Sequence, residues 1–285
     1  MQAPPKLVCR DTVLDLTEPV VMGILNVTPD SFSDGGRHAD SEAAVEWALA
    51  MAAEGAAIID VGGESTRPGA APVGLEDELA RVVPVIERLA RRARVPISID
   101  TTKPEVMRAA VAAGACLIND VRALQAPGAL AAAAETGAGV CLMHMRGEPR
   151  TMQVDPQYRS VVDDVRNDLG ARIAACEAAG IPRERICIDP GIGFGKRPEH
   201  NLALLAALDR LADPAIPVLV GVSRKSLLGI ITGRPTGERL AGSVALAALS
   251  VMRGAAIIRA HDVAATVDAV KVASALRRAA AGGSG

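Results

Sequence analysis

Polar and ionisable residues end a series of short apolar runs along the chain, and they are the first candidates for chemistry. These residues are Asn26, Asp60, Asp100, Asn119 with Asp120, His144, Asp189, Ser223, and Arg259 with His261. A buried carboxylate without a partner is energetically costly, so any single ending of this kind could be a helix cap or a core hydrogen bond. Their repetition along the chain favours one shared binding site.

Two groups of residues suit an anionic ligand. Arg259 and His261 lie two residues apart on one apolar run, so in a strand their side chains face the same side. With Asn26 they could surround a phosphate group that carries a divalent metal. Residues 221–226, GVSRKS, place two adjacent cations between hydroxyls. This pattern suits a negatively charged or carbonyl-rich ligand, and the alternative is solvated surface charge.

Three glycine-rich loops follow these runs. Residues 28–37 and 62–69 form loops longer than is usual between a strand and a helix, which favours segments that order over a ligand rather than plain surface connections. The third loop, DPGIGFGK at 189–196, matches neither the phosphate-loop pattern nor G-x-G-x-x-G, so nucleotide binding there is not expected. It places Phe194 among glycines, and Phe32 has a similar place in the first loop. Each ring could contact a flat ligand.

The elements that must position these residues alternate regularly. The apolar runs cover residues 20–27, 56–62, 96–100, 116–121, 139–145, 186–191, 217–223 and 255–261, and helical patterns cover 42–55, 76–92, 103–114, 128–137, 158–180, 198–212, 237–254 and 262–278. Buried strands that alternate with helices predict a covered parallel sheet, and eight such units predict an α/β protein with a single (β/α)8 TIM barrel. The rival is a doubly wound open sheet. Its first loop should carry a dinucleotide-binding glycine pattern, and residues 26–29, NVTP, do not.

The domain organisation follows from these patterns. Residues 1–19 are predicted to be an N-terminal extension that could add a hairpin over the barrel floor. Residues 20–278 form the predicted barrel, and residues 279–285 are expected to be a disordered tail. Ser41 is the predicted N-cap of the first helix.

Composition excludes several classes of protein. The formal net charge of −2 argues against a broad basic surface, so no nucleic-acid partner is expected. No apolar run approaches the roughly 20 residues of a membrane span, and residues 1–11 lack an apolar signal core. The five cysteines form no CxxC pair, which indicates buried, reduced thiols and a cytoplasmic protein.

Motifs along nearly the whole chain resemble the dihydropteroate synthase family of the folate pathway, the target of sulfonamides. The matching segments are MGILNVTPDSFSDGG (22–36), IDVGGESTRPGA (59–70), SIDTTKPEV (98–106), INDV (118–121), MHMRGEP (143–149), IDPGIGFGK (188–196), GVSRKS (221–226) and GSVALAALSVMRGAAIIRAHDV (242–263). The resemblance implies a TIM barrel, a homodimer and a Mg2+ cofactor. It also implies the small-molecule substrates 6-hydroxymethyl-7,8-dihydropterin diphosphate and p-aminobenzoate, which the family joins into 7,8-dihydropteroate with release of diphosphate.

The same resemblance implies a role for each matching residue. The catalytic set would be Asn26, Asp100, Asp189, Lys225, Arg259 and His261. The pterin would be held by Asp100, Asn119, Asp189 and Lys225, and the diphosphate by Asn26, Thr66, Arg259 and His261. The aminobenzoate pocket would consist of Phe32, Thr66, Arg67, Pro68, Phe194, Lys225 and Ser226, and the metal ligands would be Asn26 and Asp34. An SN1-like path is implied, in which Asp100 or Asp189 stabilises a pterin cation.

Departures from the family pattern are few, and two rival functions stay open. Thr102, Leu227, Ala260 and Arg146 differ from residues that are common in the family, but none replaces a matched site residue. A methyltetrahydrofolate:corrinoid methyltransferase shares the pterin-binding barrel but has no diphosphate to bind. The second rival is a family member that binds a pterin or a protein partner without turnover.

Overall fold

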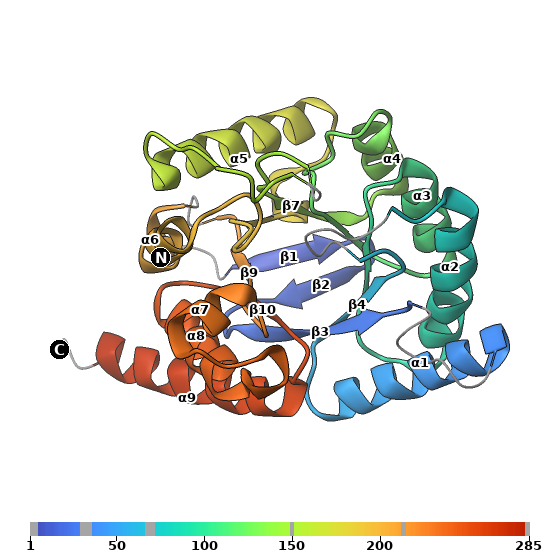
Figure 1. The fold of residues 1–285 in the computed structure, drawn as a ribbon. Helices are drawn as coiled ribbons and strands as arrows, with labels where there is room; N and C mark the ends of the chain where they lie inside the picture. Colours follow the sequence, from blue (N-terminus) through green and yellow to red (C-terminus); the bar gives the residue numbers. More distant parts are fainter. Residues whose placement is uncertain (1–4, 29–35, 66–71, 149–150, 212–214, 283–285) are drawn as a thin grey trace.

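The computed structural model describes residues 5–28, 36–65, 72–148, 151–211 and 215–282, with side chains left out at 36–40 and 281–282. In this part of the chain, eight parallel strands form the wall of a barrel with helices outside it (Figure 1). The strands are β3 (Val20–Asn26), β4 (Ile58–Gly62), β5 (Ile97–Asp100), β6 (Leu117–Asp120), β7 (Gly139–Met143), β8 (Ile186–Asp189), β9 (Leu219–Gly221) and β10 (Ile257–Ala260). The TIM barrel expected from the sequence is confirmed.

Neighbouring strands pair in the order β8-β7-β6-β5-β4-β3-β10-β9. A parallel bridge between Ile188 and Val218 links the two ends of this order, and the Ile188 amide donates to the Pro217 carbonyl at 3.0 Å. The sheet is therefore nearly closed. All strand C-termini point to one end, which becomes the mouth of the barrel.

The helices cover the outside of the wall. They are α1 (Gly36–Ala53), α2 (Leu75–Arg92), α3 (Pro104–Ala113), α4 (Ala129–Thr136), α5 (Val161–Ala178), α6 (Pro198–Ala206), α7 (Ser226–Thr232), α8 (Leu240–Met252) and α9 (Val263–Gly282). The described residues also contain three 3₁₀ turns, namely η2 (Arg183–Arg185), η3 (Leu208–Arg210) and η4 (Thr236–Glu238). Strands such as β4 and β7 are buried on both faces, because helices pack outside and aliphatic side chains fill the interior. Among the described residues, no helix combines the length and the apolar character needed to cross a membrane.

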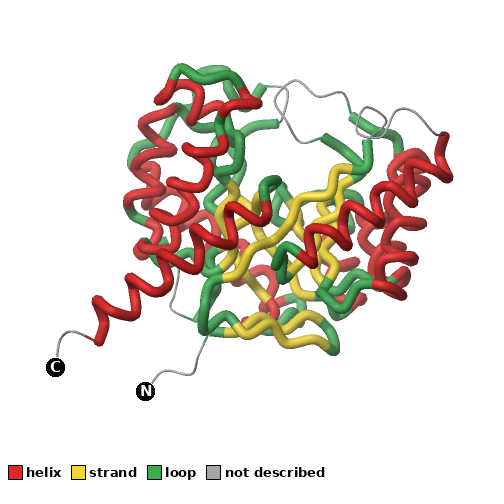
Figure 2. The backbone as a smooth tube through the Cα atoms, turned by 90° about the horizontal axis from the view of Figure 1, so that it is seen from below, coloured by secondary structure: helices red, strands yellow, loops and turns green. Residues whose placement is uncertain are grey.

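An antiparallel hairpin of β1 (Lys6–Cys9) and β2 (Thr12–Asp15) lies at the floor of the barrel (Figure 2). Leu7 and Cys9 are fully buried and pack with apolar side chains from the N-terminal ends of the strands. A Cβ atom on Gly139, where β7 begins, would lie 3.0 Å from the Cys9 sulfur. The hairpin therefore seals the end of the barrel opposite the mouth.

Several helices differ from the sequence-based expectation, and α6, for example, ends at Ala206 although the pattern predicted a helix over 198–212. The predicted N-cap at Ser41 is wrong, because α1 begins at Gly36 and the Ser41 hydroxyl accepts a hydrogen bond from Arg88 at 2.6 Å. The sequence did not indicate α7, a short helix that starts within a polar segment. The last helix, α9, continues to Gly282, past the end predicted at residue 278.

Candidate active site

Arg259 on β10 joins two acids from different strands at the mouth. Its Nε donates to Asp60 Oδ2 at 2.6 Å, and its Nη2 donates to Asp100 Oδ2 at 2.8 Å. Asn119 of β6 donates from Nδ2 to the same Asp60 oxygen at 3.0 Å. The parallel register sets Asp100 beside Asn119, so these side chains come together because their strands are neighbours. The structure therefore brings these polar strand ends together at the mouth, as the sequence predicts.

Each of the two acids keeps one oxygen that receives no hydrogen bond from the described residues. Asp60 Oδ1 and Asp100 Oδ1 are buried, and no donor in that part of the chain reaches either atom. Burial raises the pKa of Asp100 to about 7, while Arg259 opposes the shift. A buried acceptor without a donor is costly, so these oxygens are suited to the N–H groups of a ligand.

Asp189 ends β8 on the other side of the mouth, where Lys225 provides the nearby positive charge. The Asp189 Oδ1 accepts the Gly191 amide at 2.7 Å, and burial raises the pKa of Asp189 while Lys225 opposes the rise. Burial lowers the pKa of Lys225 to about 8, with Asp189 acting in the opposite direction. The Lys225 Nζ donates to the Ile192 carbonyl and lies 4.7 Å from the centroid of the Phe194 ring. Lys225 thus connects the acid of β8 with the aromatic face of the following loop.

The predicted anion-binding residues lie on neighbouring strands. Asn26 ends β3, which pairs with β10, and His261 directly follows β10. The His261 Nδ1 lies 3.1 Å from the Ser223 hydroxyl, which also accepts the His261 amide at 3.2 Å. The guanidinium of Arg259, however, is turned to Asp60 and Asp100, so Arg259 joins the anion end of the site to the acidic end.

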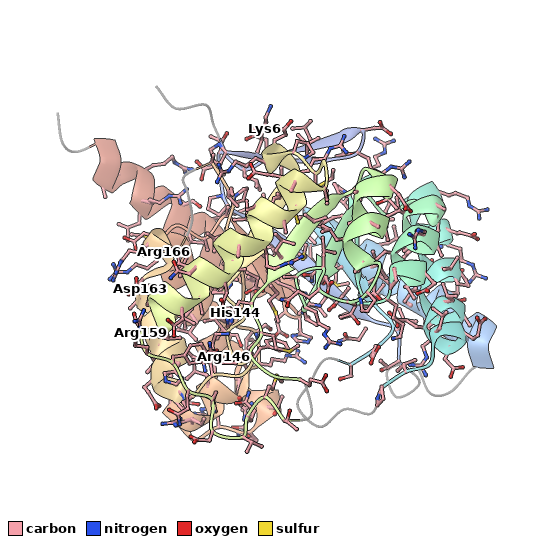
Figure 3. All side chains as sticks on the ribbon, turned by 90° about the horizontal axis from the view of Figure 1, so that it is seen from above. Lys6, His144, Arg146, Arg159, Asp163 and Arg166 are labelled. Carbon is pink, nitrogen blue, oxygen red and sulfur yellow. The ribbon has the colours of Figure 1, made fainter. Side chains whose placement is uncertain are left out.

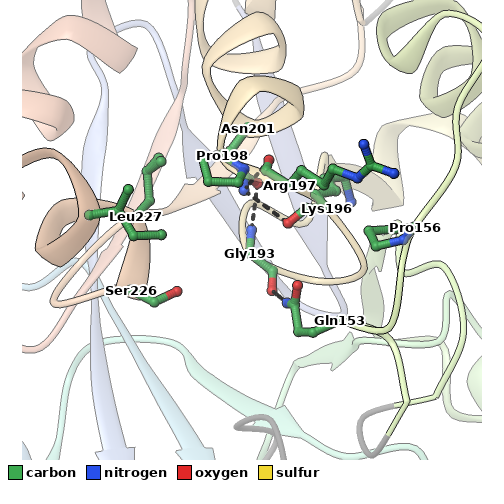
Figure 4. Close-up of a pocket in the computed structure, with 10 residues that line it drawn as sticks. Gln153, Pro156, Gly193, Lys196, Arg197, Pro198, Asn201, Ser226 and Leu227 are labelled. Atoms are coloured by element: carbon green, nitrogen blue, oxygen red, sulfur yellow. Dashed lines mark hydrogen bonds between the residues drawn. The ribbon is translucent and has the colours of Figure 1, made fainter.

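A depression beside the mouth lies between the loop after β8 and the start of α7. Gly193 and Ser226 line it, together with Gln153, Pro156, Lys196, Arg197, Pro198, Asn201, Leu227 and Ile230 (Figure 4). Its volume is about 180 Å³. The Asn201 Oδ1 accepts the Gly193 amide at 2.7 Å, which fixes one wall of the depression.

Five predicted site residues, Phe32, Asp34, Thr66, Arg67 and Pro68, lie outside the described residues.

Two polar strand ends serve the loops that follow them. Asp120 accepts the amides of Arg122 at 2.7 Å and Leu124 at 2.9 Å, so it shapes the turn after β6. His144 follows β7 and lies with Arg146 beside α5 (Figure 3), and its Nε2 is 3.2 Å from Asp168 of that helix. Burial, followed by the charges of Lys196 and Arg146, lowers the pKa of His144 to about 3. The ring is therefore neutral at pH 7.

The sequence-based assignment missed two residues at the mouth. Asp60 was recognised as a polar strand end but received no role, although it accepts hydrogen bonds from both Arg259 and Asn119. Lys196 received no role because its loop fits no phosphate-binding pattern, yet its side chain is buried within that loop. The available signal was a lysine that follows three closely spaced glycines on a loop at the mouth.

Comparisons with known proteins agree with this geometry. The family described as "Pterin binding enzyme" matches residues 22–261. A dihydropteroate synthase of Escherichia coli K12 is 55% identical over 270 residues, which cover 95% of this chain and 96% of that protein. The Xanthomonas albilineans dihydropteroate synthase solved with 4-aminobenzoic acid has a TM-score of 0.91 and 54% identity, covering 96% of this chain and 99% of that one. The Burkholderia cenocepacia dihydropteroate synthase complexed with 7,8-dihydropteroate has a TM-score of 0.89 and 52% identity, covering 99% of both chains. The chain therefore belongs to the dihydropteroate synthase family of pterin-binding enzymes.

Proposed function

We propose that the protein joins 6-hydroxymethyl-7,8-dihydropterin diphosphate to p-aminobenzoate, giving 7,8-dihydropteroate and diphosphate. The observation that carries this proposal is the pair of buried oxygens on Asp60 and Asp100 that receive no hydrogen bond within the described part of the chain. A pterin presents adjacent N–H groups along one edge, and carboxylates accept such paired donors well. The solved relatives that hold 4-aminobenzoic acid and 7,8-dihydropteroate support the same choice of substrates.

The pterin would lie between the two acidic sides of the mouth. Asp100 and Asn119 would bind one part of its edge, and Asp189 and Lys225 another part. The flanking charges are held in place before the ligand arrives, because Arg259 already pairs with Asp60 and Asp100. Such pre-organisation lowers the cost of binding.

The reaction would break the bond between the pterin methylene carbon and the diphosphate oxygen. The carbon would then share positive charge with the pterin ring, and Asp100 and Asp189 could stabilise that charge. The amine nitrogen of p-aminobenzoate, which is neutral at pH 7, would form the new C–N bond and release its proton. Exclusion of water would protect the cation from hydrolysis. This order of events is the SN1-like path.

The departing diphosphate would occupy the side of the mouth formed by β3 and β10. Arg259 and His261 would bind its oxygens, and Asn26 would supply an oxygen ligand to Mg2+. Among the described residues, no group of three carboxylate, histidine or cysteine ligands could hold a metal. Mg2+ is commonly bound by one or two protein oxygens together with substrate phosphates, and the diphosphate would supply the latter. When bound, Mg2+ would offset the charge of the leaving group.

The aminobenzoate would lie against Phe194, with Lys225 and Ser226 at its other side. The Phe194 ring can contact the flat face of the substrate, and Ser226 is exposed beside the depression in Figure 4. Cationic and hydroxyl groups suit the carboxylate of this substrate.

Diphosphate release with and without p-aminobenzoate and Mg2+ tests the proposal. A synthase should release diphosphate and form dihydropteroate in a way that depends on both additions. Turnover of methyltetrahydrofolate with a corrinoid protein would instead identify the methyltransferase. Pterin binding without any turnover would identify a protein that only binds.

A homodimer is also proposed, through an apolar face on α8 and α9. These helices pack together, and each exposes large apolar side chains at helical spacing: Leu249 and Met252 on α8, Val272 and Leu276 on α9. Analytical ultracentrifugation of Leu249→Glu and Val272→Glu should show monomers.

The cytoplasm is the proposed compartment, since all five cysteines are buried free thiols that suit reducing conditions.

A further inference from the structure

The loop between β8 and α6 is held by its carbonyl groups. Residues 191–196 form no helix or strand, yet each of their carbonyl oxygens accepts a side-chain hydrogen bond. The donors are Lys196 to Gly191 (2.9 Å) and to Phe194 (3.0 Å), Lys225 to Ile192, Gln153 to Gly193 (2.6 Å), Tyr158 to Gly195 (2.8 Å) and Asn201 to Lys196 (3.4 Å). A loop bound in this way resists movement although it lacks regular structure.

Lys196 is the centre of this arrangement. It is only 2% exposed, and its ammonium also lies 3.0 Å from His144 Nδ1 and 3.3 Å from the His144 carbonyl. A buried charge is costly unless polar partners surround it, and here the partners are acceptors on two neighbouring loops. Because the His144 ring is neutral, Nδ1 can accept from Lys196 while the Nε2 proton points to Asp168.

The loop after β7 and the loop after β8 are in direct backbone contact. The Lys196 ammonium lies between them and therefore has little room to move. Gly191 and Gly195 have φ values of +66° and +61°. A Cβ atom on Gly191 would overlap the His144 carbonyl oxygen, and one on Gly195 would overlap the carbonyl oxygen of Arg146. The contact therefore depends on glycine at both positions.

We propose that Lys196 is a positioning residue for the aminobenzoate half of the site. It binds the carbonyl of Phe194 from inside the loop, so it sets where the Phe194 ring meets Lys225. Its ammonium faces His144, Gly191 and Phe194, so it acts on the substrate only through Phe194. This role rests on the proposed synthase function.

The steady-state kinetics of Lys196→Met separate a positioning role from a purely structural one. Methionine has a similar length but cannot bind the carbonyls, so Phe194 should lose its fixed place. We expect KM for p-aminobenzoate to rise about tenfold and KM for the pterin diphosphate to change less than about twofold. Lys271→Met, at an exposed position on α9, is the matched control and should leave both values unchanged.

Other outcomes overturn the proposal. An unchanged KM for p-aminobenzoate, or a fall in kcat with both KM values unchanged, would show that Lys196 does not position the aminobenzoate half of the site. If Lys196→Met does not fold, Lys196→Gln takes its place; its amide nitrogen is one bond closer to Cα and carries no charge, so it cannot bind all the acceptors of Lys196 and the same rise in KM for p-aminobenzoate is expected. Failure of both variants to fold would assign Lys196 to stability alone. Absence of synthase turnover in the wild-type protein would instead contradict the proposed function.

Discussion

At the scale of single residues, the mouth of the barrel combines more acid than base. Arg259 pairs with two carboxylates, and Lys225 provides the nearby positive charge for Asp189. Burial of these acids costs solvation, and the described residues supply only part of the hydrogen bonds that the acids can accept. A ligand rich in N–H donors would supply the rest, which makes substrate binding the event that completes the polar network.

Replacing Asp189 tests the importance of this network for catalysis. Asp189→Asn keeps the shape of the side chain and an acceptor for the Gly191 amide but removes the charge beside Lys225. We expect kcat/KM for the pterin diphosphate to fall by about 10² or more. Asp268→Asn on the exposed side of α9 is the control and should be active. Wild-type pterin affinity and turnover in Asp189→Asn would remove Asp189 from the site.

Asp100 should make the stability of the ligand-free protein depend on pH. Its pKa rises from 3.8 to about 7 in the folded protein, chiefly through burial. The folded state therefore binds this proton more tightly than the unfolded chain. The stability due to Asp100 is complete below about pH 4 and is lost as the pH rises through 7.

Asp100→Asn has no such proton, so its stability relative to wild type should increase between pH 5 and pH 8. The expected change in the free energy of unfolding is on the order of 1–3 kcal/mol. Urea denaturation of both proteins without substrates measures it, with Asp268→Asn as a control that should show no trend. A constant difference across this range would mean that Asp100 is ionised throughout.

The residue types at the strand ends could be recognised from the sequence, but their pairings could not. Asp100, Asn119, Asp189 and Arg259 were assigned as site residues from strand position and motif. The bonds from Arg259 to Asp60 and Asp100 join residues 199 and 159 positions apart in the sequence, respectively. Such pairs depend on how the barrel closes, and local patterns carry no information about that.

At the scale of elements, the strands were easier to predict than the helix ends. A buried strand shows itself as a continuous apolar run, and all eight were found close to their observed bounds. The helix α7 was missed because it has only seven residues and begins beside the polar pair Arg224 and Lys225. The first turn of α1 was missed because its sequence is polar and lacks the hydrophobic periodicity of an amphipathic helix.

The loop after β8 allows a matched test of close backbone contact. Gly195 and Gly180 have φ values of +61° and +87°, so alanine is strained at both positions. Only the Cβ atom at residue 195 would meet backbone, since nothing lies within 4 Å at residue 180. Gly180→Ala should cost about 1 kcal/mol and leave the kinetics unchanged. Gly195→Ala should cost more and raise KM for p-aminobenzoate. Equal effects of the two variants would show that the loop can move away from Arg146 freely.

At the scale of the whole molecule, the barrel separates function from stability. The strand C-termini carry the ionisable residues of the site, and the floor is a layer of aliphatic and cysteine side chains from the β1–β2 hairpin and the N-terminal ends of the barrel strands. Closure of the barrel allows both ends to be built from the same eight strands. The mouth keeps costly buried charges for binding, and apolar packing elsewhere offsets that cost.

Leu7 on β1 tests this separation directly. It is fully buried in the floor, at the end of the barrel away from Asp189 and Arg259. Leu7→Ala removes buried methyl groups and leaves a cavity, so the free energy of unfolding should fall by about 2–5 kcal/mol. The KM values for both substrates should stay within about twofold of wild type, because no contact of the mouth changes. Val13→Ala is the control from the same hairpin, since Val13 is 59% exposed and should lose little stability. A large rise in either KM in folded Leu7→Ala would mean that the floor and the mouth are coupled through the strands, and that the hairpin supports catalysis as well as folding.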